Sequence, residues 1–316
     1  MELSRSMHNP SPRRVGRLAI GLAAAGSIVA ALAVPGAAAF ADVSTGVTGY
    51  TISMGAVTTI PANSSGVSQV ADAFCRPGKV VLSGGVANHA STVFIRTSYP
   101  TDSTTWQAVV TPTTNISYPE TFQTYAICVD ASSVPGYHQV QTAPLPVGVA
   151  TYYGPNKAVG DAYCSAGEVV VGGGVRSHNP STFLTVSRPT TDNRAWEVEV
   201  HLTNPPSYGG ETYQVSSVCI PSSDVSSYTI NTATTSTYGT GLTQAAPSNA
   251  AGSPYCGVGT LAVAGGATNH DQTNGFISSV APNSSGKYWV VVDRDINPPS
   301  YGESFLPNSV CVTGTT

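Results

Sequence analysis

The chain carries very little charge. Only 9% of its 316 residues are Asp, Glu, Lys or Arg, and lysine occurs three times, at Lys79, Lys157 and Lys287. Residues 42–316 keep 9 of the 13 basic and 16 of the 17 acidic residues, which gives that part a net charge of −7. A nucleic-acid partner would require a basic patch. The sequence therefore predicts no nucleic-acid partner.

The short motifs of common enzymes are also absent. The chain contains no GxSxG, HExxH or Walker sequence, and no GxGxxG that opens a helix. No CxxC pair indicates zinc or redox chemistry. We therefore predict a non-catalytic protein that needs no metal and no cofactor.

Long apolar runs are missing after residue 41. The one such run, at residues 18–34, follows a basic stretch and precedes a small-x-small cleavage site at residues 39–41. This order is typical of a secretory signal. We predict that residues 1–41 are a signal peptide, that the remainder is secreted, and that the remainder has no membrane span.

Three copies of one unit make up the rest of the chain. In each copy a glycine lies nine residues and a histidine fourteen residues after a cysteine, at Cys75–Gly84–His89, Cys164–Gly173–His178 and Cys256–Gly265–His270. A tryptophan, a Ser-Tyr pair, a glutamate and a closing cysteine follow in the same order. Short polar linkers separate the copies, so we predict three β repeats at residues 42–134, 135–225 and 226–316.

Two cysteines in each repeat of an exported chain predict disulfides. Pairing within each repeat is the simplest of the fifteen possible connectivities, and it joins Cys75 to Cys128, Cys164 to Cys219 and Cys256 to Cys311. Each bridge would close a loop of 53 to 55 residues. Such a loop is worth about 4 kcal/mol by the chain-entropy argument.

The residue pattern inside each repeat predicts strands. Residues 195–202 alternate apolar and polar side chains, which indicates a strand with one buried face. We expect about six strands per repeat, which in the first lie near residues 50–56, 68–75, 79–84, 92–98, 105–112 and 120–129. Pro307 cannot donate a backbone hydrogen bond, so we expect its strand to be an edge strand or to carry a bulge.

The predicted fold class is all-β. The linkers, the size of the unit and the one disulfide per unit favour three tandem antiparallel β-sandwich or barrel modules, each stapled by its own disulfide. The alternative is a single β-prism-like body with pseudo-threefold symmetry. An immunoglobulin domain fits poorly, because its tryptophan follows the first cysteine much more closely.

The pattern Cys-x-x-Gly, Gly-Gly, Trp, Cys resembles a module of exported proteins from high-GC Gram-positive bacteria. In the first repeat it consists of Cys75-Arg-Pro-Gly78, Gly84-Gly85, Trp106 and Cys128, and its three copies cover nearly all of the chain after residue 41. The resemblance implies a secreted β module and no particular activity. The chain is also similar to three-repeat β-prism proteins of extracellular coats, although its unit is much longer.

Histidine, tyrosine and glutamate recur together beyond what packing demands. The Asn, Pro and Ser residues before each tyrosine favour a turn, which would expose the aromatic ring in a loop. An exposed ring beside His and Glu suits stacking on a sugar, and three such sites would give avidity. The candidate ligand-binding residues are His89, Tyr118, Glu120, His178, Tyr208, Glu211, His270, Tyr301 and Glu303. The simpler alternatives are a histidine bonded to a neighbouring loop and a tyrosine that closes the end of its module.

Three other features have structural interpretations. The paired glycines, of which Gly84-Gly85 is the first, close a strand and indicate a bulge or a turn with positive φ. The tryptophans are expected in the core. Glu197, Glu199 and His201 share one face of a strand at ligand-like spacing, and a solvated strand face is the better interpretation.

Three functions remain open. The first is multivalent binding of an extracellular ligand, with a polysaccharide or cell-surface glycan preferred. The second is a structural or assembly component of an extracellular or cell-surface particle, with a protein partner. The third is a secreted enzyme or enzyme inhibitor, which three near-equal copies of one polar cluster make the weakest of the three.

Overall fold

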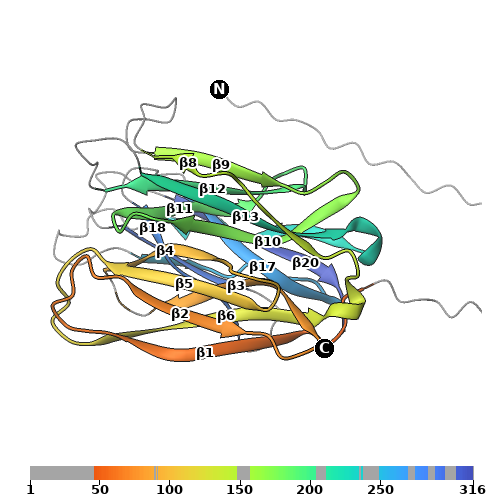
Figure 1. Ribbon diagram of the computed structural model, residues 1–316, viewed down its shortest axis with the longest axis horizontal. Helices are drawn as coiled ribbons and strands as arrows, with labels where there is room; N and C mark the ends of the chain where they lie inside the picture. Colours follow the sequence, from red (N-terminus) through yellow and green to blue (C-terminus); the bar gives the residue numbers. More distant parts are fainter. Residues whose placement is uncertain are drawn as a thin grey trace, which may run out of the picture. The chain divides into compact units, whose positions relative to one another are not determined.

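The described part of the chain is built from β-strands. The computed structural model describes residues 46–88, 90, 92–147, 157–203, 211–234, 236–237, 249–269, 275–283, 289–295 and 304–315. These residues form three antiparallel sheets and contain no α-helix (Figure 1). The all-β prediction is therefore confirmed. The predicted signal peptide lies outside the described residues.

Each sheet combines strands of two repeats. The first has the order β1 (Thr51–Ile60), β6 (Glu120–Asp130), β3 (Lys79–Asn88), β18 (Gly275–Pro282), β19 (Trp289–Asp295), β16 (Asn249–Gly252). The second has the order β2 (Gln69–Phe74), β5 (Thr105–Pro112), β4 (Val93–Pro100), β10 (Glu168–Ser177), β13 (Thr212–Pro221), β7 (His138–Gln141). The third has the order β14 (Tyr228–Thr232), β20 (Ser304–Thr313), β17 (Thr260–Asn269), β11 (Thr182–Pro189), β12 (Ala195–Leu202), β9 (Lys157–Tyr163). Two short strands, β8 (Leu145–Pro146) and β15 (Ser236–Thr237), pair with β13 and β20.

The strands of each repeat are thus divided between two sheets. Strands of different repeats pair at three places, which we call seams. The pairs are β3 with β18, β10 with β4, and β17 with β11. Figure 1 shows the second of these, with yellow β4 beside green β10. The two predicted linkers contain short 3-10 turns, at Ala131–Ser133 and Ser222–Asp224. The six strands expected in the first repeat are all present.

The three disulfides have the predicted connectivity. Cys75 is bonded to Cys128, Cys164 to Cys219, and Cys256 to Cys311. In each pair the first cysteine follows a strand of one sheet and the second lies within a strand of another. Cys75, for example, follows β2 of the second sheet, while Cys128 lies in β6 of the first. Each bridge therefore links the two sheets that its repeat helps to build.

Tryptophan and glycine pack against each other inside the repeats. The side chains of Trp106 and Trp196 are each 1% exposed. A Cβ atom on Gly84 would overlap the Trp106 ring, and one on Gly173 would overlap the Trp196 ring. The indole nitrogens donate hydrogen bonds to serine hydroxyls, each at 2.9 Å, on Ser98 and Ser187. The predicted place of the tryptophans in the core is confirmed for these two.

The second glycine of two of the pairs lets the two strands of a seam approach each other closely. A Cβ on Gly174 would overlap the carbonyl oxygen of Ser98 across the seam, and one on Gly266 would overlap that of Ser187. The expectation that the paired glycines end a strand or adopt positive φ was wrong, because they lie within β3, β10 and β17 and their φ is not positive. The expected bulge does occur, just before each pair.

A different set of glycines makes the tight turns. Gly78, Gly167 and Gly259, the last residues of the three Cys-x-x-Gly segments, have φ values of +86°, +87° and +82°. Glycine adopts this conformation without the steric penalty that other residues incur. These turns lead directly into β3, β10 and β17, so they set where the central strand of each repeat begins.

The buried side chains of all three repeats meet. One cluster of buried apolar residues includes Val86, Val175 and Val310, which come from the first, second and third repeats. A second cluster consists of Phe94, Phe183 and Phe276, again one from each repeat. The centroids of these three rings lie 5.4 to 5.9 Å apart. The rings meet at tilted or edge-to-face angles, which aromatic pairs prefer.

The expectation of an edge strand or a bulge at Pro307 was wrong. Its strand, β20, is not an edge strand, because β17 pairs along one side of it and β14 and β15 along the other. Pro307 lies between the β14 ladder, which ends at Asn308, and the β15 ladder, which begins at Phe305. A residue without an N–H is tolerated in that gap. Opposite Pro307, β20 and β17 pair without a register shift.

The seam contact predicts the effect of a single methyl group. Replacing Gly174 with alanine would force the Ser98 strand away, so we expect the free energy of unfolding to fall by about 2 kcal/mol or more. Gly257→Ala is the matched control, because its new Cβ would meet nothing within 4 Å. Denaturant titration of both variants checks this, and equal stabilities would contradict the close approach at the seam.

Candidate functional site

The predicted ligand-binding residues fall into two groups. Tyr118, Glu120, His178 and Glu211 lie within the described part of the chain. The other five lie outside it, namely His89, Tyr208, His270, Tyr301 and Glu303.

Tyr118 lies in the loop between β5 and β6, and its side chain is 78% exposed. The same loop is anchored by Asn115, whose side-chain oxygen accepts a hydrogen bond from the Ser65 amide at 3.2 Å. Glu120, the first residue of β6, is half-buried. The first repeat therefore presents its tyrosine ring to solvent on an anchored loop.

The histidine and glutamate loops lie at the same end of the second repeat. The backbone N–H of His178 donates to the carbonyl of Thr212 at 3.3 Å, next to Glu211. The carbonyl of Glu211 in turn accepts from the N–H of Val147 at 2.8 Å. The His178 side chain is exposed and Glu211 is half-buried. These backbone bonds place the two segments side by side.

One cluster of metal-ligating residue types occurs in the described part of the chain, but it is incomplete as a metal site. His138, Glu168 and Cys219 hold potential ligand atoms within 4.8 Å of one another. The sulfur of Cys219, however, is bonded to Cys164, so it is not available as a thiolate. The two remaining groups are too few for a typical zinc site, which uses three or four protein ligands.

The expectation of a solvated face at Glu197, Glu199 and His201 was wrong for Glu199. Glu199 is only 2% exposed. The hydroxyl of Thr185 donates to Glu199 Oε1 at 3.2 Å, and Lys157 Nζ lies 3.9 Å from the same oxygen. Burial raises the pKa of the Glu199 carboxyl, and the charge of Lys157 opposes that shift. A buried carboxylate needs such partners.

His201 is held against an aromatic ring of another repeat. Its imidazole stacks on Phe276, with ring centroids 5.6 Å apart. Its Nδ1 atom is buried without a hydrogen-bond partner. Burial, and to a smaller degree the charge of Lys157, lower the pKa of His201 to about 4. The ring is therefore neutral at neutral pH.

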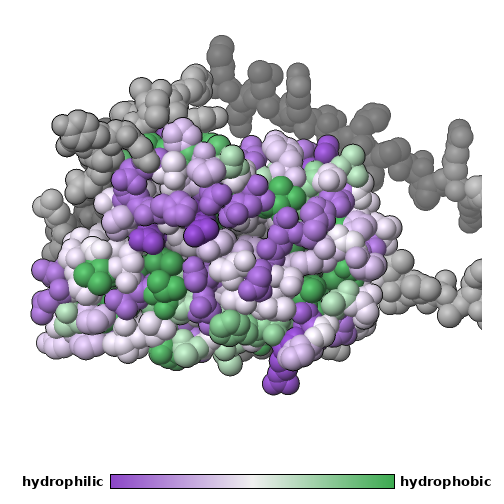
Figure 2. Space-filling model, viewed as in Figure 1, coloured by the Kyte–Doolittle hydropathy of each residue, from purple (hydrophilic) through white to green (hydrophobic). Residues whose placement is uncertain are grey.

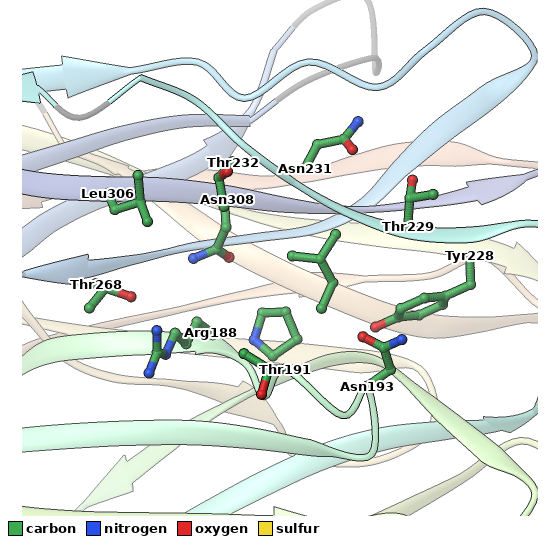
Figure 3. Close-up of a pocket in the computed structure, with 12 residues that line it drawn as sticks. Arg188, Thr191, Asn193, Tyr228, Thr229, Asn231, Thr232, Thr268, Leu306 and Asn308 are labelled. Atoms are coloured by element: carbon green, nitrogen blue, oxygen red, sulfur yellow. The ribbon is translucent and has the colours of Figure 1, made fainter.

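A groove crosses the third sheet near the seam between β11 and β17. It has a volume of about 600 Å³ and runs from the turn after β11, which includes Asn193, to β14. Figure 3 shows Arg188, Thr268 and Asn308 directed toward the same hollow. These three residues come from β11, β17 and β20, so two repeats together build the groove.

Two polar atoms in the groove lack partners. Asn308 is only 3% exposed, and its side-chain oxygen is buried without a hydrogen bond. The hydroxyl of Thr268 is also buried without a hydrogen bond. Buried polar atoms in native proteins are almost always hydrogen-bonded. Both atoms lie just beneath the surface of the groove, and a ligand hydroxyl can bond to them once rotation of the side chain brings them to that surface.

The remaining wall of the groove has both apolar and polar side chains. Ile230 and Leu306 line it together with the ring of Tyr228, whose hydroxyl donates to the Val170 carbonyl at 2.7 Å. Asn231 turns its amide to the Tyr255 carbonyl, at 2.7 Å. The tyrosine is thus fixed in place, and the groove combines a few apolar side chains with several hydroxyl and amide side chains.

Each of the other two seams has an aromatic side chain at a position that corresponds to a residue of the groove. The strand register places Tyr99 and Arg176 of the β4–β10 seam at the positions of Arg188 and Thr268. Tyr99 is 7% exposed, and the Arg176 guanidinium lies 5.7 Å from its ring centroid. At the β3–β18 seam, Tyr125 occupies the position of Asn308. At the β11–β17 seam these positions hold Arg188, Thr268 and Asn308, which line the groove.

Comparison with known proteins adds no name to this site. No protein-family model matches the chain. No curated protein matches it either. Among the described residues, no helix is long and apolar enough to cross a membrane.

The residues of the groove were not among the predicted site residues. Arg188, Thr268 and Asn308 differ from their counterparts in the other repeats, whereas the prediction rested on residues that recur. An alignment of the three repeats shows Arg188 at the position that Tyr99 has in the first repeat, and Asn308 at the position of Tyr125. The absence of an aromatic residue at these positions is the signal that identifies Arg188 and Asn308.

The state of His201 predicts a dependence of stability on pH. Because its folded pKa of about 4 lies below the usual value near 6.5, the folded state resists protonation. The stability linked to His201 is present above about pH 6.5 and is lost as the pH falls toward 4. We expect His201→Gln to lose less stability than the parent chain between pH 7 and pH 4.5. Denaturant midpoints at both values test this, with His178→Gln as the exposed control.

Proposed function

We propose that this chain is an exported, non-catalytic protein that binds a carbohydrate in the groove between β11 and β14. The observation that carries the proposal is the unsatisfied side-chain oxygen of Asn308, buried in a groove that also holds the Thr268 hydroxyl and the Arg188 guanidinium. A sugar hydroxyl can donate to the amide oxygen and accept from the guanidinium. The C–H face of the sugar can lie against Ile230 and Leu306.

Export is supported by the disulfides. Three bridges in one chain are typical of secreted proteins and rare in a reducing cytosol. The basic, apolar and small-residue order of residues 1–41 supports removal of a signal peptide. The proposed site of action is therefore extracellular.

Binding without catalysis is supported by the lining of the groove. Glycoside hydrolysis in most enzyme families uses a pair of Asp or Glu residues that flank the scissile bond. None of the described residues that line the groove is acidic. The buried carboxylate of Glu199 is bonded to Thr185 and does not line the groove.

The Ser-Tyr loops are proposed as additional contacts. The ring of Tyr118 is exposed on an anchored loop, so it can stack on a sugar without a rearrangement. Three such loops on one chain would raise the apparent affinity for a polysaccharide through effective concentration. The groove would then supply selectivity and the loops would supply avidity.

An assembly role is the second candidate, and the exposed apolar residues of the first repeat favour it. Met54 and Val57 on β1 are 63% and 62% exposed, and Val70 and Phe74 on β2 are 53% and 59% exposed. Figure 2 shows apolar surface, in green, over these two strands. Apolar patches of this kind are used as contact surfaces. This role would gain support if the chain binds no glycan.

Filling the groove with larger side chains should weaken glycan binding. The double variant Arg188→Tyr with Thr268→Arg copies the Tyr99–Arg176 pair of another seam, so it introduces a combination that this fold already accommodates. We expect the purified parent chain to bind one or more polysaccharides on an array of bacterial, fungal and plant glycans. We expect the double variant to lose at least about tenfold in affinity for them.

The control for this experiment is the reverse pair, Tyr99→Arg with Arg176→Thr, which leaves the groove intact. It should retain the glycan binding of the parent chain. Thermal unfolding of both variants shows whether each remains folded. Undiminished binding by a folded double variant would place the site elsewhere, and no binding by the parent chain would remove the proposed function.

The tyrosine loops predict a second, different loss. In the triple variant Tyr118→Ala, Tyr208→Ala and Tyr301→Ala, affinity for a long polysaccharide should fall at least about tenfold because avidity is lost. Affinity for a short oligosaccharide of the same sugar, which reaches only the groove, should change by less than about twofold. Calorimetry with both ligands measures this. An equal loss for both would mean that the loops belong to the primary site.

A further inference from the structure

Three charged residues form a row across the strands beside the groove. In the strand register Arg188 on β11 is opposite Glu197 on β12, and Glu197 is opposite Asp161 on β9. Arg188 Nε lies 2.8 Å from Glu197 Oε1. The only cation among the described lining residues is therefore already paired with a carboxylate of the protein.

Negative charge exceeds positive charge around this row. Burial raises the pKa of Asp161, and the neighbouring Glu197 raises it further, whereas Arg188 opposes the shift. Asp192 lies in the turn between Thr191 and Asn193, which both line the groove. A hydrogen bond from Thr190 lowers the pKa of Asp192, which is therefore ionised at neutral pH. Three carboxylates, of Asp161, Asp192 and Glu197, thus interact with two guanidiniums, those of Arg188 and Arg194.

This charge distribution bears on the ligand. A guanidinium binds a ligand carboxylate well when its two-pronged face is free and its charge is not compensated. Arg188 instead donates through Nε to Glu197, which compensates its charge, so a second anion placed there would meet the Glu197 carboxylate. Like charges brought together in this way suppress binding of the wrong partner. A neutral hydroxyl meets no such repulsion.

We infer that the groove selects neutral saccharides over acidic ones, with Glu197 as the residue that determines this specificity. The inference rests on the proposed function and deepens it. Glu197 acts through Arg188: it keeps the guanidinium oriented for hydrogen bonds to hydroxyl groups and neutralises the charge that would attract a uronic acid. The side chains of Asn308 and Thr268, which are uncharged, then make the contacts that any sugar can use.

The test uses pairs of ligands that share one sugar ring and differ in the group at C6. Cellulose and β-1,4-mannan oligosaccharides are each compared with the form in which the primary C6 hydroxyls have been oxidised to carboxylates. We expect the purified parent chain to bind at least one neutral form, and to bind the oxidised form of the same sugar at least about tenfold more weakly. Binding of the oxidised form with equal or higher affinity would overturn the inference and leave the proposed function standing.

The variant Glu197→Gln should bind the oxidised ligand more tightly than the parent chain does. Without the carboxylate the Arg188 charge is uncompensated, so the preference for the neutral form should fall at least about fivefold while affinity for the neutral form stays within about twofold. Asp72→Asn is the matched control, because Asp72 holds the position of Asp161 in the second sheet, away from the groove. An unchanged preference in a folded Glu197→Gln chain would contradict the inference.

A salt titration of the parent chain is independent of any variant. Screening weakens repulsion between charges at the protein surface. Binding of the oxidised ligand should therefore strengthen between 20 mM and 500 mM salt, whereas binding of the neutral ligand should stay constant. Weakening of oxidised-ligand binding over this range would show attraction in place of repulsion and would overturn the inference. Failure to bind any ligand of either kind would remove the proposed function itself, and the inference with it.

Discussion

The close packing of Trp106 and Trp196, each on a glycine of a neighbouring strand, is the contact on which the rest of the structure depends. Trp106 and Trp196 occupy the space in which Gly84 and Gly173 would carry a side chain. The ring can reach that position only because the strand has no Cβ there, and it is held by a hydrogen bond to a serine on the neighbouring strand. That serine belongs to β4 or β11, the strands that form seams with the next repeat. The core of one repeat and its contact with another are therefore fixed by the same few atoms.

This arrangement also explains why one seam can be hollow. The seams are held from within by glycine, tryptophan and serine, and the sheets are linked pairwise by the three disulfides. The side chains on the other face of a seam are thus not needed to hold it together, and they are free to differ. The β4–β10 seam buries Tyr99, and the β11–β17 seam has a groove over Asn308. The proposed binding site therefore lies where the framework tolerates a smaller or more polar side chain in place of an aromatic ring.

Several features were predictable from the sequence because they follow from local chemistry. Strand positions in the first repeat, the disulfide pairs and the burial of Trp106 follow from alternation, spacing and residue size. The role of Gly84 did not, because the sequence shows a glycine but not the ring that approaches it. Burial of Glu199 was missed because its neighbour Thr185 comes from another strand, and period-2 alternation assigns a face without saying what covers it. The predicted site at Tyr118 and His178 was placed on loops, while the groove arises from register between strands far apart in sequence.

The scarcity of charge connects the sequence to the proposed ligand. A chain with 9% charged residues cannot rely on long-range electrostatic attraction to capture a partner. Affinity must come from apolar contact and from hydrogen bonds made at short range, which require a preformed hollow with unsatisfied polar atoms. The groove over Asn308 provides these, and its one guanidinium is compensated by Glu197. Among extracellular ligands, neutral glycans offer many hydroxyls and apolar ring faces without a charge that must be matched. The low charge of the whole chain and the neutral groove at one seam therefore favour the same class of ligand.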